Sequence, residues 1–348
     1  MKMAKKKYIA VLLVVVMMIT FTACQNKREN ETQQKDATTF LMGTVVQMRV
    51  YGSNAQEVID NSFARLREIE NEMSTTIVSS EISRINTHPG EDIKVNADTY
   101  RVIKKAVEYA NLTNGRFNPA IGPLVKLWGI GTENARVPAK DEIKEALKLV
   151  NYQWIDLDDK QMTVMLEKQG MSLDLGAIAK GYAADEVRKI VKDSKVKSAY
   201  VNLGGNVLVI GGKSDGTPWK VGIQDPRHNR GNVMASIDVR DKTLVTSGNY
   251  ERYFEKDGVI YHHILDPDTG YPADSGLLSC TIITTDSFDA DVLSTSIFIL
   301  GPAKGLELVE EIDGVEAMLI TKDLGIILSS GIEGEVDILN DDFQLNGM

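Results

Sequence analysis

The chain of 348 residues is acidic, with 39 Lys and Arg against 49 Asp and Glu and a formal net charge of −10. Its hydrophobic fraction of 43% and charged fraction of 25% are ordinary for a soluble globular protein, and the length allows a large core in one or two domains. The acidic balance argues against non-specific nucleic-acid binding, which needs a basic surface.

The N-terminal segment predicts a bacterial lipoprotein signal peptide over residues 1–23. Four lysines among the first seven residues precede an apolar run at 8–21, which is short for a membrane-spanning helix. A small residue then stands directly before Cys24, as in a lipobox, although Phe21 occupies a position where Leu is usual. We expect cleavage and lipidation (palmitate included) of Cys24, which anchors the protein to the extracytoplasmic side of the cell membrane. A plain signal peptide with a chance cysteine and an uncleaved anchor are the alternatives.

The remaining chain predicts a flexible tether over residues 24–39, which are polar, followed by one domain at 40–340 without an internal linker. Helical spacing of apolar residues predicts helices at 55–73, 99–112 and 141–149, and further helices are expected from Gly176 to about 192, at 288–300 and at 303–311. Strand-like segments occur at 40–51, 154–157, 163–166, 199–203, 207–210, 219–223, 234–239, 252–254, 259–265, 278–284, 315–321 and 325–329. Because helices and strands do not alternate strictly, we expect an α+β fold, a single two-lobed domain with mixed or antiparallel sheets flanked by helices.

A first cluster of functional groups is LDLGAIAKGYAAD at residues 173–185. Asp174, Gly176 and Lys180 bring an acid, a flexible backbone and a cation to the start of a helix, and Asp185 follows as a second acid. Helix-start amides and the Lys180 ammonium favour phosphate oxygens, while an Asp beside a phosphate suggests a metal ion or a nucleotide contact. The alternative is an ordinary strand, turn and helix in which Lys180 is solvated and Asp174 caps the helix.

A second cluster is YHHILDPDTGY at residues 261–271. His262 and His263 end a strand, so alternation predicts that one faces the interior and the other faces outward. His263 is a candidate for acid–base chemistry, whereas the following DPDTG has the composition of a turn. A plain hairpin corner is the alternative, and zinc is not expected because no third His or Cys lies at a useful spacing.

A third cluster lies in the predicted helix at 288–300, where Asp291, Ser294 and Thr295 share one face. A carboxylate and two hydroxyls suit Mg²⁺, which recruits further oxygens from phosphates and water. The alternative is a helix start whose hydroxyls bond back to carbonyls. Residues 115–131 predict a structured loop that could line a pocket. Cys280 is expected to be a buried hydrophobic residue without a disulfide.

Eight segments, in order, resemble the ApbE family of FAD:protein FMN transferases over roughly residues 40–300. Each motif is weak alone, but their order makes the match specific, and members of this family are often bacterial lipoproteins. The matching segments are Met42-Gly43-Thr44, residues 80–84 followed by Asn86, 115–131, 173–185, 201–205, 246–252, 263–270 and 290–295.

The resemblance implies Mg²⁺-dependent transfer of FMN from FAD to a Thr hydroxyl of a target protein, with formation of a phosphoester and release of AMP. It implies that His263 accepts the Thr proton and that the acceptor is a flavin-dependent membrane redox subunit. The implied contacts to FAD, here a substrate, are Met42, Phe117, Asn118, Pro119, Asp174, Lys180 and Leu265. The implied ligands of Mg²⁺ are Asp291, Ser294, Thr295 and the carbonyl of Ala177. This assignment requires Lys180 and Asp291, distant in sequence, to share one cleft.

The sequence departs from the family pattern in three places. Thr76 stands where an aromatic residue is frequent, Asn118 replaces a frequent Asp, and Ala120 replaces a frequent Thr. These differences bear on stacking against FAD and on the balance between transfer and hydrolysis. A FAD pyrophosphatase that uses water in place of Thr, and a flavin-binding lipoprotein without chemistry, therefore stay open as alternatives.

Overall fold

The computed structural model describes residues 33–228 and 231–346. The predicted signal peptide, Cys24 and residues 24–32 of the predicted tether lie outside the described residues. Within the described part the tether prediction is wrong, because Gln34–Leu41 forms strand β1 and pairs with β2, Thr44–Tyr51. The backbone of β2 supplies hydrogen-bond partners to polar residues that have no apolar pattern of their own.

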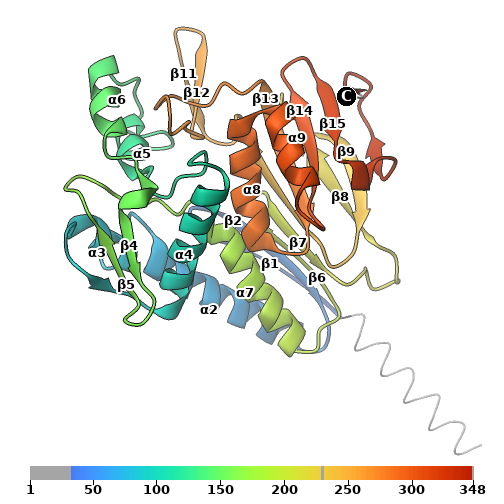
Figure 1. The fold of residues 1–348 in the computed structure, drawn as a ribbon. Coiled ribbons are helices and arrows are strands. Elements are labelled where there is room, and N and C mark those ends of the chain that lie inside the picture. Colours follow the sequence, from blue (N-terminus) through green and yellow to red (C-terminus); the bar gives the residue numbers. More distant parts are fainter. Residues whose placement is uncertain (1–32, 229–230, 347–348) are drawn as a thin grey trace, which may run out of the picture.

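Nine strands of the described chain form the central sheet, in the order β1-β2-β6-β7-β10-β13-β14-β15-β17 (Figure 1). Neighbours run antiparallel except for the parallel pair of β15 with β17. The mixed, mainly antiparallel arrangement confirms the predicted fold class. The further strands of this sheet are β6 (Ser198–Leu203), β7 (Asn206–Ile210), β10 (Thr243–Gly248), β13 (Leu277–Thr284), β14 (Glu316–Thr321), β15 (Gly325–Leu328) and β17 (Gln344–Leu345).

Helices cover one face of the sheet and enclose the main core (Figure 1). Helix α8 is apolar around most of its circumference, as expected for a helix that packs against the sheet on one side and against other helices on the rest. Cys280 of β13 lies fully buried in this core, as predicted, and burial raises the pKa of its thiol. The covering helices are α2 (Ala55–Met73), α7 (Ala179–Asp193), α8 (Ser287–Leu300) and α9 (Pro302–Glu310).

A small sheet covers the opposite face, with β8 (Trp219–Gln224), β9 (Val233–Val239) and β16 (Val336–Ile338) in the order β16-β9-β8. The second core lies between the two sheets. Side chains of β13 alternate between the cores, so that Ile282 belongs to the first and Ile283 to the second.

A second lobe lies beside the helical layer (Figure 1). In its outer part Trp128 is fully buried, packs near Ile143 and Leu265, and donates its indole N–H to the Gly270 carbonyl at 2.8 Å. The elements of this lobe and of the adjoining hairpin are α3 (Glu81–Thr87), β3 (Ile93–Lys94), α4 (Ala97–Leu112), α5 (Gly122–Trp128), α6 (Lys140–Leu147), β4 (Ile155–Asp158), β5 (Thr163–Leu166), β11 (Tyr253–Lys256) and β12 (Val259–His262). Short 3₁₀ turns occupy Tyr152–Trp154 and Ser330–Ile332.

Several predicted elements need correction. The single strand expected at 40–51 is a hairpin with its turn at Met42-Gly43, where both residues have positive φ. The loop expected at 115–131 contains α5, strand β10 and helix α3 were not predicted, and the strand expected at 259–265 ends at His262. Among the described residues, no helix is long and apolar enough to cross a membrane.

Candidate active site

A pocket of about 420 Å³ opens where α7, α8 and the end of β10 meet the second lobe. The turn between β1 and β2, the segment before α5 and the base of the β11–β12 hairpin complete its walls. Ten predicted site residues line it: Met42, Phe117, Asn118, Asp174, Ala177, Lys180, His263, Leu265, Asp291 and Thr295. Pro119 and Ser294 are buried and do not belong to its lining.

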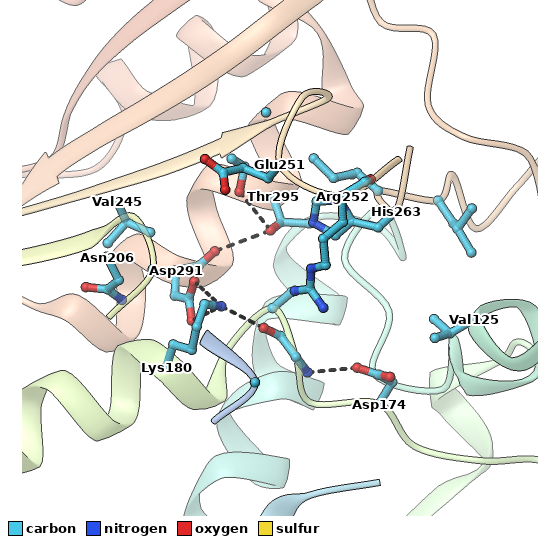
Figure 2. A pocket seen from close by; sticks show the side chains of 18 of the residues that line it. Val125, Asp174, Lys180, Asn206, Val245, Glu251, Arg252, His263, Asp291 and Thr295 are labelled. Atoms are coloured by element: carbon cyan, nitrogen blue, oxygen red, sulfur yellow. Dashed lines mark hydrogen bonds and ion pairs between the residues drawn. The ribbon is translucent and has the colours of Figure 1, made fainter. Parts of the chain in front are cut away.

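Lys180 and Asp291 meet at the contact between α7 and α8 (Figure 2). The Nζ of Lys180 lies 3.3 Å from Oδ1 of Asp291 and donates to the Gly176 carbonyl at 2.8 Å. The other carboxylate oxygen of Asp291 accepts the backbone N–H of Gly181 at 2.8 Å. The alternative in which Lys180 is merely solvated is therefore wrong, and the two residues share one cleft.

Gly181 makes this helix contact possible. A Cβ at this position would lie 2.2 Å from the carbonyl oxygen of Ser287 and 2.7 Å from Cβ of Asp291. One turn further along α7, Asp185 accepts the backbone N–H groups of Ser287 at 3.2 Å and Phe288 at 2.9 Å. Burial raises the pKa of Asp185 to about 6 against the opposing effect of Arg188. Asp185 thus fastens the start of α8 and does not line the pocket.

Three of the amides at the start of α7, which the sequence suggested for an anion, are already bonded within the protein. The N–H of Gly181 is used by Asp291, and those of Ile178 and Ala179 donate to the Leu175 carbonyl at 3.1 and 2.9 Å. The charged group in this segment that can meet an anion is the Lys180 ammonium, 21% exposed on the pocket wall.

Asp174 shapes the turn that precedes α7. Its carboxylate accepts the N–H of Gly176 at 2.8 Å, and its own N–H donates to the Pro119 carbonyl at 2.9 Å. Helix α7 begins at Ala179 without a side-chain cap, so the alternative of Asp174 as a helix cap is wrong. Pro119 does not line the pocket. Its carbonyl accepts the N–H of Asp174 and so positions a residue that does.

Oxygen atoms gather beside the Lys180–Asp291 pair. Because Asp291 takes the Gly181 N–H, no helix hydrogen bond reaches the Ala177 carbonyl in the described part of the chain. The hydroxyl of Thr295 lies 3.2 Å from that of Ser247 on β10 and 3.5 Å from the Asp291 carbonyl oxygen. One carboxylate, one hydroxyl and one backbone carbonyl thus border the same pocket.

Ser294 departs from its predicted place. The residue is fully buried, and its hydroxyl bonds to the Asp291 carbonyl at 2.9 Å and to the Ser247 hydroxyl at 2.8 Å. The alternative for this cluster was a helix whose hydroxyls bond back to its own carbonyls, and Ser294 follows that alternative. Within the described ranges, no group of three or more His, Cys, Asp or Glu is placed to hold a metal. A cation here depends on hydroxyl, carbonyl and substrate oxygens beside Asp291.

His263 lines the pocket at the base of the hairpin, next to Arg252 (Figure 2). Its Nδ1 lies 3.2 Å from the Arg252 carbonyl oxygen. Because a carbonyl only accepts, the hydrogen is assigned to Nδ1, which leaves the lone pair on Nε2. Burial, helped by the charge of Arg252, lowers the pKa of His263 well below its ordinary value, although the ring is partly accessible from the pocket. The imidazole is therefore neutral at pH 7, with an unprotonated ring nitrogen, and the lowered pKa makes it a weaker base than an ordinary histidine.

His262 faces the interior, so the predicted division between the two histidines is confirmed. Its Nε2 lies 3.1 Å from the Ala273 carbonyl oxygen, and its ring meets Phe298 edge-on at 5.7 Å. Burial lowers the pKa of His262 to about 4. In the following turn, Asp266 accepts the N–H of Asp268 at 2.8 Å, which is the local role expected from its composition.

Sequence reasoning missed several residues of the pocket, above all Arg252. The segment TSGNYER at 246–252 was one of the eight ApbE segments, but no role was predicted for Arg252, although an arginine eleven positions before a candidate histidine was an available signal. Arg116, Asn206, Ser247 and Glu251 also line the pocket. Arg116, Ser247 and Glu251 fall within two of the ApbE segments, but the spacing of residues there predicts no ligand, and Asn206 falls outside those segments.

The three departures from the family pattern have different surroundings. Asn118 lines the pocket, and its side-chain oxygen accepts the Ala120 N–H at 3.0 Å, a bond that an Asp can also make. Ala120 is fully buried outside the lining, and Thr76 bonds to Ser74 away from the pocket. Only the difference at Asn118 therefore touches the site.

The profile of the ApbE family matches residues 42–319, a range that includes all of these site residues. The chain belongs to the ApbE family. A FAD:protein FMN transferase of Klebsiella pneumoniae (strain 342) is 38% identical over 291 residues, 83% of this chain and 90% of that protein. A FAD:protein FMN transferase of Treponema pallidum (strain Nichols) is 38% identical over 323 residues, 88% of this chain and 89% of that protein. The crystal structure of the ApbE protein of Thermotoga maritima has a TM-score of 0.81 at 38% identity, covering 87% of this chain and 99% of that one.

The ApbE segments recognised in the sequence meet at the pocket. Seven of the eight contribute residues to its lining. In the eighth, Asn86 bonds to both the N–H and the carbonyl of Leu173, at 2.6 and 2.9 Å, and so holds the segment that carries Asp174. Membership of the ApbE family and the geometry of the pocket thus concern the same residues.

Proposed function

We propose that this protein is a FAD:protein FMN transferase that moves FMN from FAD to a Thr hydroxyl of an acceptor protein and releases AMP. The observation that carries the proposal is the gathering of Lys180, Asp291 and His263 in one pocket of an ApbE chain. The relatives named above carry this activity in their names.

Mg²⁺ is the proposed metal, held by the Asp291 carboxylate, the Thr295 hydroxyl and the Ala177 carbonyl. These hard oxygen donors fit Mg²⁺, which completes its shell with water and substrate phosphates. When bound, the ion supplies charge neutralisation on the diphosphate and on the leaving AMP. Ser294 positions this set indirectly. The Ser247 hydroxyl bonds to the hydroxyls of both Ser294 and Thr295.

FAD is the proposed occupant of the pocket, with its diphosphate near Lys180. The Lys180 ammonium and the Arg252 guanidinium are the cations that meet phosphate oxygens, and both line the pocket. Met42, Phe117, Asn118, Asp174 and Leu265 form the remaining contacts. Pro119 acts through its bond to Asp174.

Nε2 of His263 accepts the proton of the acceptor Thr hydroxyl. The Thr oxygen forms a bond to the phosphorus of the FMN half, the bond from that phosphorus to the bridging oxygen breaks, and AMP leaves with the bridging oxygen. Phosphoryl transfer of this kind depends mainly on alignment and charge neutralisation. The hydrogen bond of Nδ1 to the Arg252 carbonyl keeps the lone pair on Nε2.

For location, the proposal is a lipid anchor on Cys24 at the extracytoplasmic side of the cell membrane. The basic, apolar and small-residue order of the first 24 residues supports it. A protein held there can reach a flavin-dependent membrane redox subunit, the proposed acceptor.

The test combines the purified protein, FAD, MgCl₂ and a Thr-containing acceptor, followed by denaturing-gel fluorescence and nucleotide analysis. A fluorescent acceptor band with one AMP per flavin bound is expected. FMN and AMP without a labelled acceptor would identify a pyrophosphatase instead. Bound flavin with neither product would identify a flavin-binding protein without chemistry.

A further inference from the structure

We propose that the β11–β12 hairpin and the apolar rim of the pocket dock the acceptor, as an extended segment that carries its Thr past the hairpin to His263. The inference rests on the proposed function and adds where the protein substrate binds. FAD and Mg²⁺ account for the pocket and its lining, whereas the exposed hairpin residues Tyr253, Val259 and Ile260 lie outside that lining.

The hairpin leads directly into the site. Strand β11 begins one residue after Arg252, and β12 ends one residue before His263. The ladder continues below the strands, since the N–H of His263 donates to the Arg252 carbonyl at 3.0 Å. A segment lying along this hairpin is therefore guided to Nε2 of the proposed base.

One face of the hairpin is anchored and its two edges are open. Phe254 stacks on Tyr261 at 5.3 Å, and Tyr261 meets Trp128 at 5.5 Å. Strands β11 and β12 form a sheet of two, and among the described residues neither pairs with a further strand. Figure 1 shows the hairpin extending from the body of the molecule. A held hairpin with open edges can add an extended peptide as a third strand.

Exposed apolar side chains concentrate at this place. Six of the eleven large apolar side chains that are exposed in the described chain lie on the hairpin or on the pocket wall. Exposed apolar residues that share a face mark a contact surface, as Tyr253 and Ile260 do by the register of the hairpin, whereas Val259 lies on the face of Phe254 and Tyr261. On the hairpin the exposed side chains are Tyr253 (50% exposed), Val259 (49%) and Ile260 (53%), and on the wall Phe40 (69%), Val45 (42%) and Val125 (36%).

The chemistry of the proposed reaction selects an extended protein segment as the occupant. The acceptor hydroxyl must come within about 3 Å of Nε2, and His263 lies in the pocket, below the hairpin. A hydroxyl on a folded convex surface does not reach it, whereas a strand with apolar neighbours places its Thr in the pocket and its flanks on the rim. The hairpin tip carries both signs of charge, Glu255, Lys256 and Asp257, so the contact depends on apolar and backbone groups.

The test compares a hairpin variant, Tyr253→Ser with Ile260→Ser, with a control variant, Val78→Ser with Leu339→Ser. The control residues are 92% and 58% exposed and lie outside the pocket lining. The hairpin variant is expected to lower kcat/KM for the acceptor at least tenfold through KM, with KM for FAD and the melting temperature unchanged. The control is expected to match the wild type.

Equal transfer by both variants would overturn the docking proposal, as would a fall in FAD turnover without acceptor, since the hairpin would then only support the site. A wild type that labels no acceptor would instead contradict the proposed function. If the double variant is unstable, the docking proposal is tested instead by replacing Tyr253 with a photoreactive phenylalanine analogue and cross-linking it to the acceptor. Cross-linking to the acceptor there, but not at Val78, is expected, and equal cross-linking at both positions counts against docking.

Discussion

At the scale of single residues, the site depends on how the buried Asp291 is compensated. Its side chain is 5% exposed, and a buried carboxylate is costly unless charges and hydrogen bonds satisfy it. Lys180 supplies the charge and the Gly181 N–H supplies a bond. The same carboxylate still faces the pocket beside Thr295, where a bound cation can share it.

Asp291→Asn keeps the shape of the side chain and removes its charge. We expect FMN transfer to fall at least about 100-fold, because the metal contributes several kcal/mol to charge stabilisation. In thermal melts, MgCl₂ is expected to stabilise the wild type but not the variant. Asp289→Asn, on the same helix outside the pocket lining, is the control. Undiminished transfer with an unchanged response to MgCl₂ would exclude Asp291 as a ligand.

His263→Gln removes the proposed base, so we expect transfer to fall by about 10²- to 10⁴-fold while KM for FAD changes little. The lowered pKa of His263 keeps the ring neutral below the ordinary histidine value of 6.5. The wild-type kcat/KM is therefore expected to hold as pH falls through 6.5 and to decline only at lower pH. A profile measured from pH 5 to 8 checks this, with the exposed His88→Gln as control. Loss of activity centred at pH 6.5 would contradict the assignment.

At the scale of elements, the packing of α7 against α8 joins the proposed phosphate and metal ligands. The two helices approach closely at Gly181, and Asp185 fastens the start of α8. Amphipathic spacing predicted α2 over its whole length, because long periodic segments carry a strong local signal, and the mainly apolar α8 was predicted to within one residue. The β1–β2 turn was missed because Met42 takes a positive φ, which its residue type does not favour.

Gly181→Ala tests this helix contact. The new Cβ would meet the Ser287 carbonyl at 2.2 Å, so the helices must separate. We expect a loss of about 1–3 kcal/mol in the free energy of unfolding, typical of overpacking, together with reduced transfer. Urea unfolding and the gel assay measure both effects, and Lys192→Ala on the exposed side of α7 is the control. Wild-type stability in Gly181→Ala would mean that the helices do not pack this closely.

At the scale of the whole molecule, both lobes build one pocket, and the location of the protein is proposed to depend on the N-terminal segment. Segments from residue 40 to residue 299 contribute to the lining. The predicted anchor at Cys24 precedes β1, which begins only ten residues later. That spacing places the domain close to the membrane in the proposed arrangement.

Cys24→Ser is expected to move the protein from the membrane fraction to the soluble fraction and to abolish labelling by a palmitate analogue. Activity of the purified variant should remain, because Cys24 lies outside the domain. Cys280→Ala, which changes a buried residue of the core, is expected to keep both membrane attachment and labelling. A Cys24→Ser protein that still carries the lipid label would contradict the lipobox.

The sequence by itself determined the fold class, the amphipathic helices and the residue types of the site, because periodicity and motif order are local properties of the chain. It placed Lys180, His263, Asp291 and Thr295 as candidates without placing them together. Only the tertiary structure decided which of these groups remain free to contact a ligand in the pocket. The Gly181 N–H goes to a carboxylate 110 residues away, Ser294 turns toward β10, and Arg252 enters the pocket. Such partners depend on how closely distant helices and strands pack, and a linear pattern carries no measure of that distance.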